Sequence, residues 1–182
     1  RDWIGRSTGA FVDFKINSEY LITNNSREAA SIRVFTTRID TIYGANAIVV
    51  AAEHPIVLEH FDGFSDETKA VIEKIRADKL KVTDHEAEIE KEGVDTGLRA
   101  VNPFSHEDVP VWVGNYVMIE YGTGAVMSVP AHDERDYKYA KKYGLPIRQV
   151  ISEPHLVHEH HTMQALALEQ AFSEYGVLVH SD

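Results

Sequence analysis

Apolar and polar positions alternate along several short stretches of the chain, which is the pattern of half-buried β-strands. Residues 11–16 (Phe-Val-Asp-Phe-Lys-Ile) and residues 31–37 alternate with period two, so each is expected to form a strand. Residues 45–52 are apolar apart from Asn46, and such a run predicts a strand that is buried on both faces. Residues 38–44 then form the loop between these last two strands.

The second half of the chain continues the pattern of short strands. Further strands are expected at residues 95–101, 109–113, 116–120, 124–129 and 148–151. The first two of these form a hairpin, because the intervening segment is rich in Asn, Pro, Ser and Asp. Residues 121–123 (Tyr-Gly-Thr) connect the next two.

Helical spacing of apolar positions occurs in a few segments. Residues 65–81 begin with Ser65 as a helix cap, residues 133–143 end at Gly144, and residues 163–175 form a last helix. Residues 83–93 are predicted to be a short helix or a loop. Many short strands with a few helices predict an α+β fold, with a curved or barrel-like sheet at its core and peripheral helices. The length of 182 residues suits one domain.

Composition narrows the functional classes. A net charge of −11 argues against a protein that grips nucleic acid over its whole face. The stretch that holds Lys138, Lys141, Lys142 and Arg148 is either a local basic patch or, as we favour, a solvated helix face. No cysteine is present, which excludes disulfides, a thiolate nucleophile and Cys-containing zinc sites, and which fits a cytosolic origin.

The chain also lacks the signals of membrane insertion. No window contains eighteen uninterrupted apolar residues, so no membrane-spanning helix and no membrane partner are expected. The sequence begins at Arg1 rather than at Met, and we expect it to be an excised piece of a longer protein.

Two short motifs concentrate the candidate chemistry. Residues 36–41 read Thr-Thr-Arg-Ile-Asp-Thr, and residues 121–127 read Tyr-Gly-Thr-Gly-Ala-Val-Met and continue into residues 132–136, His-Asp-Glu-Arg-Asp. Glycines and hydroxyl residues at such junctions allow the backbone to approach a ligand closely. Threonines at the end of a strand are also common without any function, so the first motif by itself leaves both readings open.

The two carboxylates at the start of the helix 133–143 have a structural and a functional interpretation. Asp133 can cap the helix, and Asp136 can lie in its first turn against the positive end of the helix dipole. Alternatively, one carboxylate faces a pocket and accepts hydrogen bonds from the ammonium group of a substrate. The local pattern favours the cap, whereas the preceding Gly122-Thr123-Gly124 favours the pocket.

The sequence gives little support to two other kinds of site. Four histidines and a glutamate in residues 155–161 could ligate zinc, but their spacing fits no helical ligand pair, and we expect a solvated loop and no metal or other cofactor. A Ser/His/Asp hydrolase is not supported, because no Gly-x-Ser-x-Gly motif is present and Ser128 lies in an apolar strand.

Together these motifs resemble the editing domain that is inserted into leucyl-tRNA synthetases, also called connective peptide 1. Residues 36–44 resemble its threonine-rich segment, and residues 121–136 resemble its glycine-rich segment. Residues 3–7 and 176–179 resemble its incoming and outgoing linkers, so that residues 1–182 would be a single editing domain whose ends, 1–9 and 176–182, lead to the rest of the synthetase. Ile39 is a departure, because the family commonly has proline there.

The resemblance distinguishes between related families. Editing domains of valyl- and isoleucyl-tRNA synthetases share this mainly antiparallel fold, but the Arg-x-Asp-Thr form at residues 38–41 favours the leucyl type. The His-x-Gly-His and Lys-Met-Ser-Lys-Ser motifs of adenylate formation are absent from the chain, so it is not expected to activate amino acids.

The resemblance implies post-transfer editing in the cytoplasm. The domain would hydrolyse the ester of tRNA(Leu) mischarged with norvaline, isoleucine or methionine, and would exclude leucine. Its partners would be the 3′-terminal adenosine of the aminoacylated tRNA and the remainder of the parent synthetase. The alternatives that stay open are a valyl-type editing domain and a binding module for an aminoacyl or adenosine ligand without catalysis.

The resemblance also assigns roles to individual residues. Asp136 would hold the α-ammonium group, and Thr41 would clash with the branched side chain of leucine. Thr36 and Thr37 would lie at the scissile ester and would be catalytic together with Asp136. The implied substrate-binding residues are completed by Arg38, Tyr121, Met127, Val129, His132 and Asp133.

Overall fold

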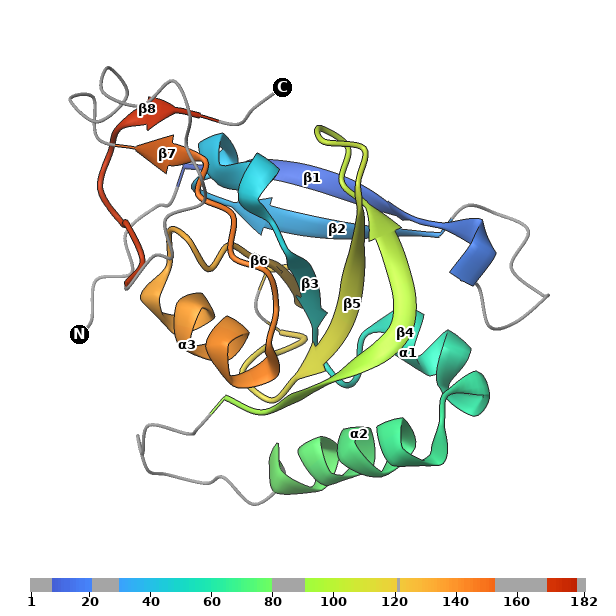
Figure 1. Cartoon of the computed structure of the whole chain (residues 1–182). Coiled ribbons are helices and arrows are strands. Elements are labelled where there is room, and N and C mark those ends of the chain that lie inside the picture. The colour runs from blue at the N-terminus through green and yellow to red at the C-terminus, as the bar shows by residue number, and fades with distance from the viewer. Residues whose placement is uncertain (1–7, 21–29, 80–90, 121, 153–169, 180–182) are drawn as a thin grey trace.

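The computed structural model in Figure 1 describes residues 8–20, 30–79, 91–120, 122–152 and 170–179. Its centre is a six-stranded sheet with the strand order β2-β1-β4-β5-β3-β6. The strands are β1 (Ala10–Ile16), β2 (Ser31–Thr36), β3 (Ala47–Val50), β4 (Gly93–Val101), β5 (Asp108–Gly114) and β6 (Ala125–Ser128). All neighbouring pairs are antiparallel except β3 and β5, which are parallel.

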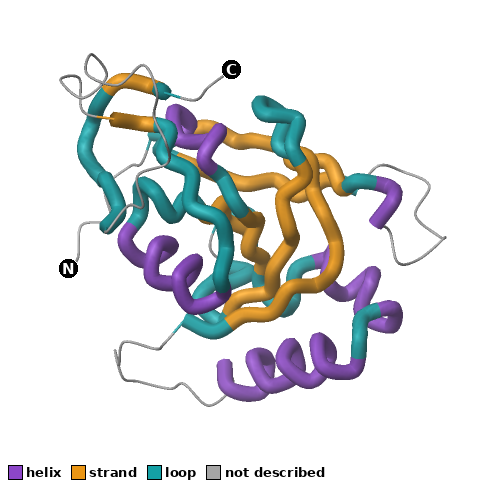
Figure 2. Tube along the Cα trace, viewed as in Figure 1, coloured by secondary structure: helices purple, strands orange, loops and turns teal. Residues whose placement is uncertain are grey.

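The sheet is strongly curved, and residues of its two edge strands, β2 and β6, contact each other (Figures 1 and 2). The bend in β4 lies at a shift of register between Asp95 and Arg99, where Gly97 adopts a φ of +83°. The expected α+β fold with a curved or barrel-like, mainly antiparallel sheet is therefore confirmed.

The alternating strands turn their apolar side chains to the inside of this sheet. Phe14 of β1, Ile32 of β2 and Leu98 of β4 are fully buried. The alternate positions of β1 and β2 are exposed or, at Phe35, partly buried. Every residue of β3 is buried, as the apolar run predicts. The period of two along each strand therefore separates core from surface.

Helices pack on both sides of the sheet. They are α1 (Pro55–His60), α2 (Asp66–Lys79) and α3 (Glu134–Tyr143), with the 3-10 helices η1 (Ser18–Tyr20), η2 (Ile39–Gly44) and η3 (Phe61–Gly63). Helices α1 and α2 complete the inner core through Ile56 and Ile72, whereas α3 covers the other face of β3 and β5. Tyr139 of α3 packs edge-to-face on Trp112 of β5, with 5.8 Å between the ring centroids. No helix in the described part of the chain is long and apolar enough to cross a membrane.

The helix termini follow the predicted capping. The Ser65 hydroxyl accepts a hydrogen bond from the Thr68 N–H of α2 at 3.1 Å. Gly144 ends α3 in the left-handed conformation, with a φ of +67°. The helix α1 was not predicted; it begins with Pro55 in its first turn and is capped by His54, whose Nδ1 accepts from the Ile56 N–H at 3.3 Å.

Some predicted elements differ from the structure. Residues 116–120 form turns rather than a strand, because the chain reverses after Gly114 and the side chain of Tyr116 packs on Tyr139. Residues 170–175 are not helical, since the Phe172 N–H bonds to the Ala131 carbonyl and the backbone leads into β8 (Val177–Leu178).

The remaining differences concern smaller segments. The short strand expected at 148–151 is β7 (Ile151–Ser152), which pairs with β8. The loop expected at 38–44 is mostly η2. Most of the segment 83–93 and the residues 163–169 lie outside the described residues.

Candidate functional site

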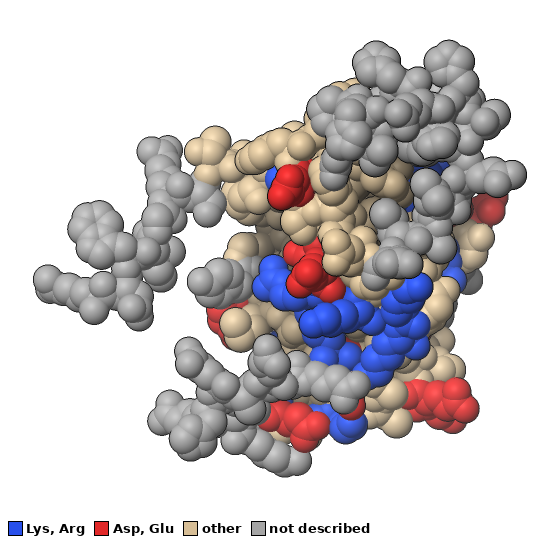
Figure 3. Space-filling model, turned by 60° about the vertical axis from the view of Figure 1, so that its left-hand side comes forward, with Lys and Arg blue, Asp and Glu red and all other residues tan. Residues whose placement is uncertain are grey.

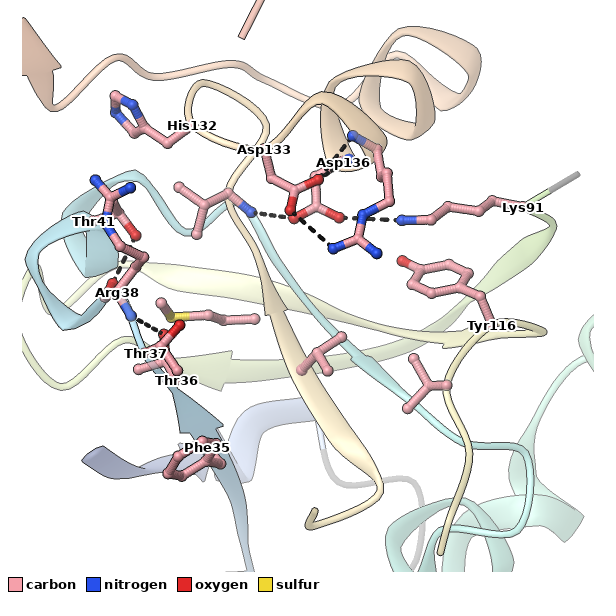
Figure 4. Close-up of a pocket in the computed structure, with 15 residues that line it drawn as sticks. Phe35, Thr36, Thr37, Arg38, Thr41, Lys91, Tyr116, His132, Asp133 and Asp136 are labelled. Carbon is pink, nitrogen blue, oxygen red and sulfur yellow. Dashed lines mark hydrogen bonds and ion pairs between the residues drawn. The ribbon is translucent and has the colours of Figure 1, made fainter. Parts of the chain in front are cut away.

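A cavity of about 510 Å³ lies between the end of β2 and the start of α3 (Figure 4). It is lined by Phe35, Thr36, Thr37, Arg38, Thr41, Lys91, Tyr116, Val117, Val126, Met127, Val129, His132, Asp133, Arg135 and Asp136. The two motifs, almost a hundred positions apart in sequence, thus meet because the edge strands β2 and β6 contact each other. The size of the cavity suits a small organic ligand.

The threonine-rich motif forms one wall of the cavity. The Thr36 hydroxyl, at the end of β2, accepts a hydrogen bond from the Arg38 N–H at 3.0 Å and so fixes the turn into η2. The Thr41 hydroxyl donates to the Arg38 carbonyl at 2.8 Å. This bond uses the proton of the hydroxyl and fixes the orientation of the Thr41 side chain in the wall of the cavity.

The side chain of Arg38 contacts one residue of η2 and two residues of the C-terminal segment. Its guanidinium is paired with Asp40 at 2.9 Å, and its Nη1 donates to the Ser173 carbonyl at 3.3 Å. The same group lies 5.3 Å from the centroid of the Tyr175 ring. These contacts connect the threonine-rich motif with the C-terminal part of the chain.

The two carboxylates of α3 have different tasks. Asp133 is the N-cap: its Oδ1 accepts from the backbone N–H of Arg135 at 2.8 Å and of Asp136 at 3.2 Å. Asp136 lies in the first turn and instead accepts the Val129 N–H at 2.9 Å through Oδ2. Its Oδ1 is 3.4 Å from the Lys91 Nζ. The predicted cap is confirmed for Asp133, while Asp136 faces the cavity.

The electrostatic environments of the two carboxylates also differ. Burial raises the pKa of Asp136 above its ordinary value, against the opposing effects of the Val129 N–H and of Lys91. Burial acts in the same direction on Asp133, but the backbone N–H groups of Asp136 and Arg135 outweigh it and lower its pKa. Asp136 is therefore a buried carboxylate that gains from an additional cation.

His132 is a structural link rather than a free base. Its Nδ1 donates to the Phe172 carbonyl at 2.8 Å, and its Nε2 accepts from the backbone N–H groups of Val150 at 3.1 Å and Ile151 at 3.2 Å. Burial lowers the pKa of His132, so the imidazole is neutral at pH 7, as this bonding pattern requires. His132 lines the cavity and joins the β6–α3 loop to two later segments.

Replacing His132 by alanine is expected to lower the free energy of unfolding by about 2–3 kcal/mol, because buried backbone groups lose their partner. Urea denaturation at pH 7 measures this change. Because glutamine places a carbonyl oxygen near the position of Nε2, His132→Gln is expected to restore part of the loss. A change below about 0.5 kcal/mol in His132→Ala would show that these bonds contribute little.

The cavity contains almost all of the residues predicted from sequence. Thr36, Thr37, Arg38, Thr41, Met127, Val129, His132, Asp133 and Asp136 line it together, and Tyr121 lies outside the described residues. Lys91 and Tyr116 were not predicted: Lys91 lies two residues before β4 in a segment without a clear pattern, and Tyr116 falls in a segment that was expected to be a strand. Their only sequence signal is an isolated charged or aromatic residue near a strand end.

Metal ligation has no support in the described residues, among which no group of three or more His, Asp or Glu side chains could hold an ion. The histidine-rich segment 155–161 lies outside the described residues.

Lys and Arg side chains gather beside the cavity. Figure 3 shows a patch of Lys and Arg side chains on the face where α3 comes forward. Arg135, Lys138, Lys141 and Lys142 of α3 are exposed, and Arg135 also lines the cavity. These side chains are exposed and gathered in a patch, so their exposure does not decide between the two interpretations of this stretch. Arg135 makes the patch continuous with the cavity wall.

Comparison with known proteins is consistent over the whole chain. The family model described as the editing domain of leucyl-tRNA synthetase matches residues 1–182. A leucine–tRNA ligase of Nitratidesulfovibrio vulgaris (strain DP4) is 44% identical over 184 residues, which cover 100% of this chain and 20% of that protein. One of Thioalkalivibrio sulfidiphilus is 46% identical, with 100% of this chain and 20% of that protein covered.

A solved structure shares both the sequence and the fold. The leucyl-tRNA synthetase of Agrobacterium radiobacter K84, in a ternary complex with tRNA and LeuAMS, is 35% identical with a TM-score of 0.61. The match covers 90% of this chain and 18% of that one, so the chain spans about a fifth of the length of its relatives. The fold, the paired motifs and these matches agree: the chain belongs to the family of leucyl-tRNA synthetase editing domains.

Proposed function

We propose that this domain hydrolyses the ester bond of tRNA(Leu) that carries norvaline, isoleucine or methionine, and that it spares leucyl-tRNA(Leu). The observation that supports this proposal most strongly is the cavity itself, in which the Asp136 carboxylate and the threonine-rich wall face the same space. Such editing is needed because one methylene group gives a synthetic site only about 1–3 kcal/mol of discrimination.

Asp136 would bind the α-ammonium group of the esterified amino acid. Its carboxylate is only 15% exposed, so a charge-assisted hydrogen bond there is less screened than one at the surface. The Val129 N–H keeps Oδ2 in place and leaves Oδ1 for a cation. This contact would restrict the site to esters of amino acids.

Thr41 would exclude leucine by steric clash. Its side chain is 1% exposed and is fixed through the Arg38 carbonyl, so it cannot rotate away without losing a hydrogen bond. Norvaline is unbranched at the γ carbon, whereas leucine carries a second methyl group at that point. A rigid methyl group in the wall discriminates against the branched side chain.

Hydrolysis would rely on positioning. An aminoacyl ester is already activated, and the neighbouring ribose hydroxyl can relay a proton, so a covalent intermediate is not required. Thr36 and Thr37 would orient the attacking water or the ester beside Arg38, and backbone N–H groups of this turn would stabilise the oxyanion. Met127 and Val129, on the opposite wall, would contact the adenine of the terminal nucleotide, together with Tyr121.

The partners in this proposal are the 3′ end of tRNA(Leu) and the rest of a synthetase in the cytoplasm. The relative that was solved with tRNA is a full synthetase, and this chain corresponds to 18% of it. With a net charge of −11, the isolated domain is expected to bind tRNA weakly and to contact few phosphates.

Single-turnover deacylation with the chain in excess tests the proposal. Norvalyl-tRNA(Leu) is expected to be hydrolysed well above the rate in buffer, and leucyl-tRNA(Leu) is expected to be spared. Tight binding of a non-hydrolysable aminoacyl-adenosine without any hydrolysis would show a binding module instead. Faster hydrolysis of threonyl-tRNA than of norvalyl-tRNA would show a valyl-type editing domain.

A further inference from the structure

The Lys91 ammonium group already lies inside the cavity, next to Asp136. Lys91 lies two residues before β4, and its Nζ is 3.4 Å from the Asp136 Oδ1 (Figure 4). The two side chains are 22% and 15% exposed, so the pair is largely shielded from water. The other carboxylate oxygen, Oδ2, is engaged by the Val129 N–H. Lys91 therefore uses the oxygen that a ligand cation would need.

An aromatic ring completes the surroundings of this ammonium group. Nζ lies 4.0 Å from the centroid of the Tyr116 ring, within the range of a cation–π contact. Burial raises the pKa of the Tyr116 phenol, so the ring stays neutral at pH 7. A carboxylate beside an aromatic face is a typical environment for binding an ammonium ion.

The other cations of the cavity have partners of their own. Arg38 is paired with Asp40, and Arg135 is exposed and lies 3.5 Å from Asp133. Among the described residues, Lys91 is thus the cation that contacts Asp136. Its stem reaches the cavity from the β4 side, opposite to the threonine-rich wall (Figure 4).

We propose that Lys91, held between the Asp136 carboxylate and the Tyr116 ring, occupies the position of the incoming α-ammonium group in the empty domain and competes with the substrate for it. The inference rests on the proposed function, because it identifies the incoming cation as the α-ammonium group. A ligand must displace Lys91 or accept repulsion from it, and both lower the affinity for aminoacyl ligands. Lys91 is therefore a specificity-determining residue that keeps this position from binding weaker cations.

Binding of two analogues to the intact chain at pH 7 tests this inference. The first is a non-hydrolysable norvalyl-adenosine, and the second is its deamino counterpart, in which hydrogen replaces the α-ammonium group. Lys91→Met is expected to bind the norvalyl analogue about tenfold more tightly than the wild type, because a buried repulsion between like charges is removed. The affinity for the deamino analogue is expected to change by less than about twofold, since that ligand carries no cation.

Two variants serve as controls. Lys91→Arg retains the charge and is expected to show no selective gain for the norvalyl analogue over the deamino analogue. Lys74 pairs with Glu92 at 2.8 Å, its side chain is 57% exposed, and it does not line the cavity. Lys74→Met is therefore expected to change the affinity for neither analogue. If Lys91→Met does not fold, as judged by thermal unfolding, Lys91→Gln makes the same test.

The outcomes separate this inference from the proposed function. Unchanged or weaker binding of the norvalyl analogue by Lys91→Met would overturn the inference about Lys91. An equal increase in affinity for both analogues would also overturn it, because that result would indicate only that the smaller side chain enlarges the cavity. If norvalyl-tRNA(Leu) is hydrolysed but the variant gains nothing, the editing function stands and only the role of Lys91 is wrong. If the wild type neither binds the norvalyl analogue nor hydrolyses the ester, both proposals fail.

Discussion

Asp136→Asn is expected to lower kcat/KM for norvalyl-tRNA(Leu) by at least about 100-fold. A hydrogen bond between buried charged groups contributes about 1.5–3 kcal/mol. Without this bond the ammonium group of the substrate would also remain desolvated in the cavity, which adds to the loss. Asparagine has nearly the shape of aspartate, so the change removes charge rather than volume. Asp108→Asn is the matched control, since Asp108 pairs with Asn17 outside the cavity and the rate should not change. A loss below about fivefold in Asp136→Asn would exclude an essential role for this carboxylate.

The pH dependence gives an independent reading of the same group. Only ionised Asp136 binds the ammonium group, and burial raises the pKa of this carboxyl above its ordinary value of 3.8. As the pH is lowered, kcat/KM is therefore expected to decrease at a higher pH than it would for an ordinary aspartate. The Asn variant should lack this acid limb. The pKa of Asp136 is higher in the folded than in the unfolded chain, so the folded state binds its proton more tightly. Protonated Asp136 therefore stabilises the fold below pH 3.8, and this stabilisation is lost as the pH rises through the pKa of the folded state. Ionised Asp136 thus lowers stability at neutral pH, where it is needed for binding.

Thr41→Ala is expected to make leucyl-tRNA(Leu) a substrate, with a rate of hydrolysis that rises about 10- to 200-fold, since a methyl-sized space in a pocket corresponds to about 1–3 kcal/mol. The hydrolysis of norvalyl-tRNA(Leu) should change little, because its side chain does not reach the space that is opened. Deacylation of the two substrates by the variant measures both effects.

A buried threonine elsewhere provides the control for Thr41. Thr96 is 5% exposed, lies outside the cavity and, like Thr41, donates its hydroxyl to a backbone carbonyl, that of Val111 at 2.7 Å; it also accepts from the Leu98 N–H at 3.2 Å. Thr96→Ala should lower stability to a similar extent and still spare leucyl-tRNA(Leu). If leucine remained protected in Thr41→Ala, the steric role of Thr41 would be wrong.

Periodicity predicted the strands well where one face is buried and the other is solvated. In β1, Val12, Phe14 and Ile16 point inward and the residues between them are exposed, so the sequence carries the pattern directly. The segment 116–120 has the composition of a strand but does not form one. Tyr116 packs on Tyr139 of α3, and Tyr116 and Val117 line the cavity, so their apolar character serves packing outside the sheet. The apolar pattern alone does not distinguish such packing from a strand.

The candidate site was predicted where its residues are close in sequence. Asp133 and Asp136 lie within one turn at the start of α3, and the threonines lie within six positions from the end of β2 to η2, so each half was visible as a motif. Lys91 reaches Asp136 across 45 positions, and only the tertiary structure brings the two together. The parallel pairing of β3 with β5 is another such feature, because it depends on long-range topology.

The most direct measurement for the central claim is a structure of the domain with the non-hydrolysable norvalyl-adenosine. We predict that the α-ammonium nitrogen lies within about 3 Å of the Asp136 carboxylate and that the scissile carbonyl lies beside the turn from Thr36 to Arg38. A ligand whose ammonium group points into solvent, or one that binds outside this cavity, would contradict the account.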